Sequence, residues 1–161
     1  MLEGLVQNDH PLTLHHILDR MRRVYGASEV VTLTDDGPTR ATYADVAGRV
    51  DKLAHALKSL GIKEEDRVAT FAWNTQRHLE IYMAAPCMGA VLHTLNIRLF
   101  AEQLEYIVNH AEDRVVLVDP ALARRARGLT YHPPRGTQNE MFDPGGLRRW
   151  RDCRGTGISI S

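Results

Sequence analysis

The spacing of apolar residues predicts two helices in the first part of the chain. Between Thr13 and Gly26 apolar positions recur at the helical period, and these two residues suit the N-cap and the C-terminal end of a helix. A second helix is expected over residues 43–60, where Thr42 and Asp45 have the spacing of a capping pair and Gly61 follows. Each helix has one apolar face, so each is expected to pack one side against a core.

A short hairpin is expected between these helices. β-rich runs at 29–34 and 39–43 flank the polar segment 35–38, which contains Asp-Asp-Gly-Pro. Glycine supplies a positive φ for the turn, and Pro38 cannot donate to the ladder, so the turn is expected to include it.

Residues 67–119 alternate between strand and helix patterns. The β-rich runs are 67–73, 90–95 and 114–119, and the helical patterns between them are 76–88 and 101–112. This order predicts βαβαβ, which is an α/β fold whose right-handed crossovers make the strands parallel and cover both faces of the sheet. Pro86 is expected to end or kink the first of these two helices.

Composition divides the chain at Pro120. Residues 1–120 carry 12 basic and 17 acidic groups, whereas residues 121–161 carry 8 basic groups, all of them Arg, and 3 acidic groups. The second segment is rich in Gly, Pro and Arg and cannot bury enough apolar surface to offset the entropy of ordering it. We therefore expect a folded unit at 13–120 and a mostly disordered tail at 121–161.

Several protein classes are disfavoured by composition. The hydrophobic share of 43% and charged share of 25% are near the globular average. No apolar run reaches the roughly 18 residues that span a bilayer, and the N-terminus lacks a secretory pattern. Cys87 and Cys153 are expected to be free thiols. A cytoplasmic protein without a transmembrane segment is the expectation.

Motifs for catalysis or metal binding are absent from the sequence. His15 and His16 point in different directions on a helix, and Asp35 and Asp36 are expected at a solvated hairpin tip. Cys87 lies in an apolar stretch that suits a structural thiol. No GxSxG or Walker motif occurs, so no catalytic, cofactor-binding or metal-binding residue is assigned.

The tail contains two features that resemble binding motifs. Gly155-Thr156-Gly157 lacks a preceding strand and a lysine, so it is not expected to hold phosphate. Trp150 is flanked by arginines without an aromatic platform, so no nucleic-acid partner is expected.

Residues 42–119 resemble the N-terminal part of AMP-forming acyl-CoA synthetases, most of all the medium- and long-chain fatty-acid ligases. The correspondences follow the family's order and spacing. They are Thr42-Tyr43, Gly61 to Arg67-Val68-Ala69, Asn74, Met88-Gly89-Ala90-Val91, Asn96 with Arg98-Leu99, Tyr106-Ile107, His110-Ala111-Glu112 and Asp119. With residues 13–41, the resemblance covers about two-thirds of the chain.

The resemblance implies a fatty-acid–CoA ligase. In that family a carboxylate reacts with MgATP to give an acyl-adenylate and pyrophosphate, and the coenzyme A thiol then displaces AMP. The family's phosphate loop, adenine and ribose contacts and lid lysine match no position here, so we expect a truncated, inactive segment that binds no cofactor alone. Asn96 and Arg98 are the most site-like residues of the matched region, because they follow a strand's C-terminal end.

Three further expectations come with this interpretation. The change of pattern near residue 121 suggests the hypothesis of a frameshift in a gene for a full ligase. The sheet edges of an isolated segment are expected to favour self-association. The alternative function is a non-catalytic α/β binding or regulatory module whose basic tail engages an anionic partner; a receiver-like domain is disfavoured because its acidic pair and lysine are absent.

Overall fold

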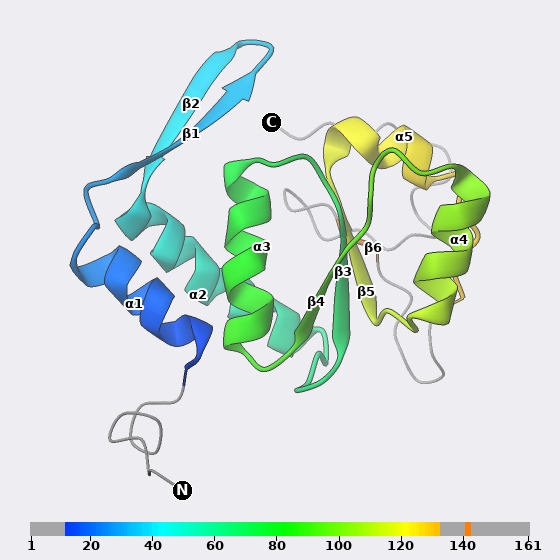
Figure 1. Cartoon of the computed structure of the whole chain (residues 1–161), viewed down its shortest axis with the longest axis horizontal. Helices are drawn as coiled ribbons and strands as arrows, with labels where there is room; N and C mark the ends of the chain where they lie inside the picture. Colours follow the sequence, from blue (N-terminus) through cyan, green and yellow to red (C-terminus); the bar gives the residue numbers. More distant parts are fainter. Residues whose placement is uncertain (1–11, 133–140, 143–161) are drawn as a thin grey trace, which may run out of the picture.

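A computed structural model describes residues 12–132 and 141–142 (Figure 1). Helices and strands alternate along most of the chain. In order they are α1 (Leu14–Arg23), β1 (Glu29–Thr34), β2 (Gly37–Thr42), α2 (Tyr43–Ser59), β3 (Arg67–Phe71), α3 (Gln76–Cys87), β4 (Val91–Thr94), α4 (Ala101–His110), β5 (Val115–Val118), the 3-10 turn η1 (Pro120–Leu122), α5 (Ala123–Ala126) and β6 (Met141–Phe142). The expected α/β class and element order are confirmed.

The central sheet has the strand order β4-β3-β5-β6, and each neighbouring pair is parallel. Side chains alternate between its faces, as the pleat requires. Val68 and Leu117 face a core shared with α2 and α3, whereas Phe71 and Val116 face a core shared with α4 and α5. Helices therefore cover both faces, as expected for right-handed crossovers.

The first helix and the hairpin attach to this sheet through α2 and α3. Leu18 and Met21 of α1 pack with Val46 and Val50 of α2 in a third cluster, and the hairpin extends beyond the helices in Figure 1. The buried Thr32 hydroxyl of β1 accepts a hydrogen bond from the Gln76 N–H at 3.0 Å. This contact joins the hairpin to the first turn of α3.

The capping pair expected for α2 is present. The Thr42 hydroxyl accepts from the Asp45 N–H at 3.1 Å, and the Asp45 carboxylate accepts from the Thr42 N–H at 3.1 Å. The Thr42 hydroxyl also donates to the Asp45 carboxylate at 2.6 Å, and this hydrogen bond, followed by that from the Thr42 N–H, lowers the pKa of Asp45. Two N–H groups that lack partners within the helix are thereby satisfied.

Of two local expectations in the first 40 residues, the first is confirmed in position only and the second is wrong. Thr13 occupies the N-cap position of α1 but makes no side-chain capping hydrogen bond; its carbonyl accepts from the His16 N–H. The hairpin ladder continues through Pro38, which pairs with Leu33, so the turn consists of Asp35 and Asp36. Strand β2 tolerates proline because a two-stranded hairpin leaves every residue on an edge strand.

The packed unit extends beyond the expected boundary at Pro120. Leu122, Ala126 and Leu129 are buried against the face of the sheet that also holds Phe71. Leu122 and Ala126 are four residues apart along η1 and α5, and Leu129 follows the turn after α5, so even an Arg-rich sequence supplies an apolar face. Residues 133–140 and 143–161 of the expected tail lie outside the described residues.

Side chains of α4 hold the segment that follows α5. The Asn109 amide donates to the Thr130 carbonyl at 2.8 Å, and its oxygen accepts from the His132 N–H at 2.7 Å. The Glu105 carboxylate accepts from the Thr130 N–H at 2.8 Å. These bonds fix residues 130–132 against α4.

Within residues 12–132 and 141–142, no helix combines the length and the apolar character that crossing a membrane would require.

Candidate functional site at the C-terminal edge of the sheet

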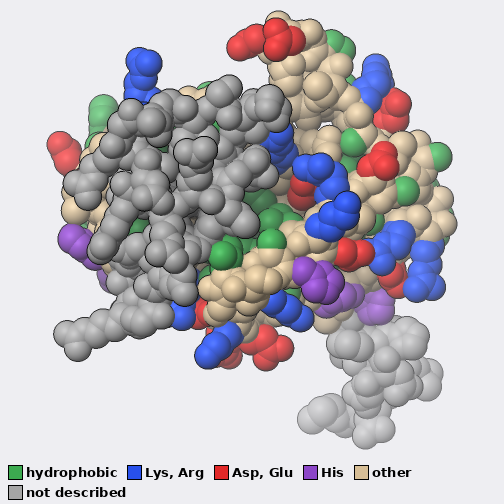
Figure 2. All heavy atoms as spheres, turned by 180° about the vertical axis from the view of Figure 1, so that it is seen from behind, with side chains coloured by type: hydrophobic (Ala, Val, Ile, Leu, Met, Phe, Trp, Pro, Cys, Tyr) green, Lys and Arg blue, Asp and Glu red, His purple; other side chains and the backbone are tan. Residues whose placement is uncertain are grey.

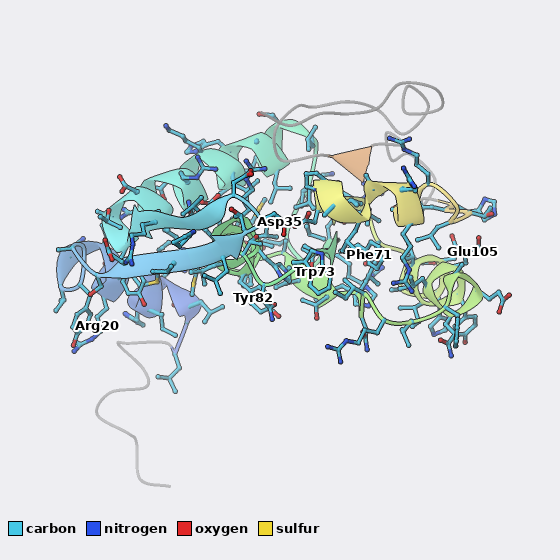
Figure 3. The ribbon with its side chains drawn as sticks, turned by 90° about the horizontal axis from the view of Figure 1, so that it is seen from above. Arg20, Asp35, Phe71, Trp73, Tyr82 and Glu105 are labelled. Carbon is cyan, nitrogen blue, oxygen red and sulfur yellow. The ribbon has the colours of Figure 1, made fainter. Side chains whose placement is uncertain are left out.

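The C-terminal ends of β3, β4 and β5 lie along one edge of the sheet, and Figure 3 looks down on it. Open α/β sheets bind ligands at this edge. Trp73 follows β3 here and is about half exposed. This edge is therefore the candidate site.

The loop after β4 carries Asn96 and Arg98. The Asn96 side-chain oxygen accepts a hydrogen bond from the Arg98 N–H at 2.9 Å, so this amide is used to shape the turn. The guanidinium of Arg125 on α5 donates to the carbonyls of Ile97 and Leu99, the latter at 2.6 Å. Arg125 thus fixes the backbone of this loop against α5. The Arg98 side chain is exposed.

His78 lies in the first turn of α3, and its side chain contacts β3. Its Nε2 is 3.0 Å from the hydroxyl oxygen of Thr70, a fully buried residue of β3. The His78 ring also packs edge-on against Tyr82, with ring centroids 4.9 Å apart. Burial lowers the pKa of His78, while the Trp73 carbonyl and the charge of Asp119 oppose that shift. Neutral imidazole is therefore favoured at this position.

Asp119 directly follows β5. Its carboxylate accepts from the Ala121 N–H at 2.9 Å and so caps η1. Asp119 and His78 line a small cavity of about 10 Å³, together with Thr75 and Pro120. The cavity lies between the C-terminal ends of β3 and β5.

A buried acid–imidazole pair lies near the opposite edge. Both Asp113 carboxylate oxygens are 2.9 Å from Nδ1 of His93, and Asp113 has no exposed surface. Burial raises the pKa of Asp113, and the hydrogen bond from His93 opposes the shift. Tyr131 donates to the Asp113 carbonyl, and burial raises the pKa of that phenol. Sequence reasoning missed this pair because its members are 20 residues apart.

The remaining candidates from the sequence are dispersed. His15 and His16 are exposed on α1, and Asp35 and Asp36 form the exposed tip of the hairpin. Cys87 is a free, partly buried thiol whose pKa is raised mainly by burial. Cys153, Trp150 and Gly155–Gly157 lie outside the described residues. Among residues 12–132 and 141–142, no three His, Cys, Asp or Glu side chains gather as metal ligands would.

The outer surface of α1 and α2 carries mixed charge. A groove of about 200 Å³ between them is lined by basic groups such as Arg22 and Lys58 and by acidic groups such as Asp19 and Asp51. Arg22 binds both carboxylate oxygens of Asp51, at 2.9 and 2.8 Å. Figure 2 shows basic, acidic and His side chains interspersed over this half of the rear face. Opposite charges alternate here instead of forming a field of one sign.

The chain is similar to members of one known protein family. A family model described as "AMP-binding enzyme" matches residues 20–153. A medium-chain-fatty-acid–CoA ligase from Ectopseudomonas oleovorans is 45% identical over 74% of the chain, and a long-chain-fatty-acid–CoA ligase from Thermus thermophilus is 48% identical over 71%. A Mycobacterium tuberculosis fatty acyl CoA synthetase structure covers 81% of the chain at 26% identity, with a TM-score of 0.65. The match spans 22%, 21% and 26% of these three chains, respectively.

Proposed function

This chain belongs to the AMP-binding enzyme family, and we propose that it is the N-terminal segment of a fatty-acid–CoA ligase. The observation that carries the proposal is the identity of 45% and 48% to two fatty-acid–CoA ligases over about 70% of the chain. In the proposed reaction of the complete enzyme, a carboxylate oxygen of the fatty acid attacks the α-phosphorus of ATP, and the bond from that phosphorus to the departing pyrophosphate breaks, which leaves an acyl-adenylate. The thiolate sulfur of coenzyme A then attacks the acyl carbon, and AMP leaves.

We propose a scaffold role for the described residues in that reaction. Their polar groups at the ligand edge are largely engaged in holding the backbone, as with Asn96 in its turn and Asp119 at η1. The Arg98 side chain is exposed there and offers a positive charge to an anionic ligand. ATP, magnesium and coenzyme A are assigned to the complete enzyme, and the chain alone is proposed to be inactive. A cytoplasmic location stays a prediction.

A chimera tests the proposal directly. Residues 13–132 would replace the matching segment of the Ectopseudomonas oleovorans ligase, and acyl-CoA formation would be followed with ATP, Mg²⁺, a medium-chain fatty acid and coenzyme A. We expect an active chimera and no pyrophosphate release by the chain alone. A folded chimera that forms no acyl-CoA would contradict the scaffold assignment.

The same experiment separates this proposal from a non-catalytic binding module. Such a module would have no reason to restore a ligase, and its basic tail would give salt-sensitive binding to a polyanion. We expect the chain to show no such binding to heparin or nucleic acid at physiological salt.

We further propose that the isolated chain self-associates. Among the described strands β4 pairs only with β3, and Val91 on it is about half exposed. An unprotected outer strand is a template for pairing with another chain. Sedimentation should show concentration-dependent association, and a single monomeric species at all concentrations would contradict it.

A further inference from the structure

The imidazole of His78 has one satisfied and one unsatisfied nitrogen. Nε2 is bonded to the Thr70 hydroxyl at 3.0 Å. Nδ1 is buried and has no hydrogen-bond partner among the described residues. The whole side chain is only 7% exposed, so bulk water does not reach it freely.

A buried polar atom without a partner requires an explanation, because such a group loses its hydration and gains nothing in return. The Trp73 carbonyl raises the pKa of His78 as a nearby backbone hydrogen-bond acceptor, but its position does not give Nδ1 a hydrogen bond of normal geometry in this structure. An internal water molecule is the common solution for such an atom.

The cavity beside His78 is large enough for one internal water molecule. Its volume of about 10 Å³ is close to the minimum for one water molecule. Its polar lining residues are Thr75, Arg77 and His78 at the start of α3 and Asp119 after the end of β5, so His78 and Asp119 reach it from different elements. A carboxylate accepts hydrogen bonds. A water molecule that accepts a hydrogen bond from Nδ1–H can therefore donate one to Asp119.

We propose that this cavity is a hydration site for one water molecule, which accepts a hydrogen bond from Nδ1–H of His78 and donates one to the Asp119 carboxylate. In this arrangement Thr70 donates to Nε2, so each polar group from Thr70 to Asp119 has a partner. The water would join the first turn of α3 to the end of β5. It would also connect the interior of β3 to the ligand edge by continuous hydrogen bonds.

Nuclear magnetic resonance of the ¹⁵N- and ¹³C-labelled full chain tests the site. The ring proton Hε1 of His78 is bonded to carbon and stays observable whatever the exchange rate of the ring N–H. We expect a cross-peak between Hε1 and water with the sign of a long-lived bound molecule, and ring nitrogen shifts of the Nδ1–H form. The absence of that cross-peak would overturn the proposal.

Two comparisons sharpen the result. His55 supplies an internal reference, because its Nδ1 lies 2.8 Å from the Asp51 carbonyl in a direct hydrogen bond. A coupling between His78 Nδ1 and the Trp73 carbonyl like that of the His55 pair would show a direct bond and contradict a bridging water. Ala72→Val places two methyl groups at the cavity wall and should abolish the water cross-peak; its persistence there would also count against the site.

Discussion

Arg49 on α2 and Glu80 on α3 form an ion pair with an Nε–Oε1 distance of 2.6 Å. The two ends differ in environment, because the Arg49 side chain is half exposed whereas the Glu80 side chain is 7% exposed. Gln76 donates a second hydrogen bond to the same carboxylate at 2.8 Å. The negative charge of Glu80 therefore lies inside the contact between the two helices, and the half-exposed guanidinium of Arg49 neutralises it.

Removing Arg49 should destabilise the chain. Arg49→Met keeps the aliphatic stem but leaves the buried carboxylate with only Gln76, which should lower the free energy of unfolding by roughly 1–3 kcal/mol, less than for a wholly buried pair. Urea unfolding measures it. In the Glu80→Gln background the same change should cost little, and equal losses in both backgrounds would show that the pair does not couple.

His78 should make stability depend on pH. Its folded-state pKa lies below the ordinary value of 6.5, so unfolding takes up a proton at mildly acidic pH. The stabilisation from neutral His78 is complete above that value and is lost as the pH falls through the lowered pKa. The urea midpoint of the wild type should fall more between pH 7 and 5 than that of His78→Gln. His55→Gln, at an exposed position, should follow the wild type.

Gly89 should not tolerate alanine. Its φ is +86°, and an added Cβ would lie 2.6 Å from Cγ of Glu64. Gly89→Ala should cost roughly 1–2 kcal/mol of unfolding free energy, part of which Glu64→Ala should restore. Gly48→Ala is the matched control, because nothing lies within 4 Å of the added Cβ on α2, and it should stabilise by about 0.5–1 kcal/mol. Similar effects at both glycines would contradict the conformational argument.

The boundary of the packed unit can be tested within the full chain. Leu122 is 8% exposed and packs with the core around Phe71, so Leu122→Ala should cost roughly 2–4 kcal/mol of unfolding free energy. Arg124, two positions later, is exposed. Its change to alanine should alter stability by less than about 0.5 kcal/mol. If Leu122→Ala changed the unfolding free energy as little as Arg124→Ala does, the packed unit would end at Pro120.

The regular part of the fold could be predicted because its signals are local. The period of apolar residues located α2, α3 and the three parallel strands to within a few residues, and the Thr42–Asp45 spacing identified a real capping box. The end of the unit was misplaced for a physical reason. Composition averages over many positions, whereas burial depends on a few, and Leu122, Ala126 and Leu129 suffice to bury one face of an Arg-rich turn.

The polar contacts could not be predicted in the same way. Thr70 with His78 and His93 with Asp113 meet only after the strands have paired, so no short motif marks them. The place of Asn96 after a strand predicts a residue close to a ligand site. Its hydrogen bond to the Arg98 N–H shows that such a position also serves the backbone.

The Asn109 carboxamide offers one donor and one acceptor to residues 130–132, as a neighbouring strand would. It contacts the Thr130 carbonyl and the His132 N–H, which nearly every amino acid provides. This contact therefore allows almost any amino acid at position 132, because it uses only the backbone. Proline alone is forbidden there, because it lacks the N–H that Asn109 requires.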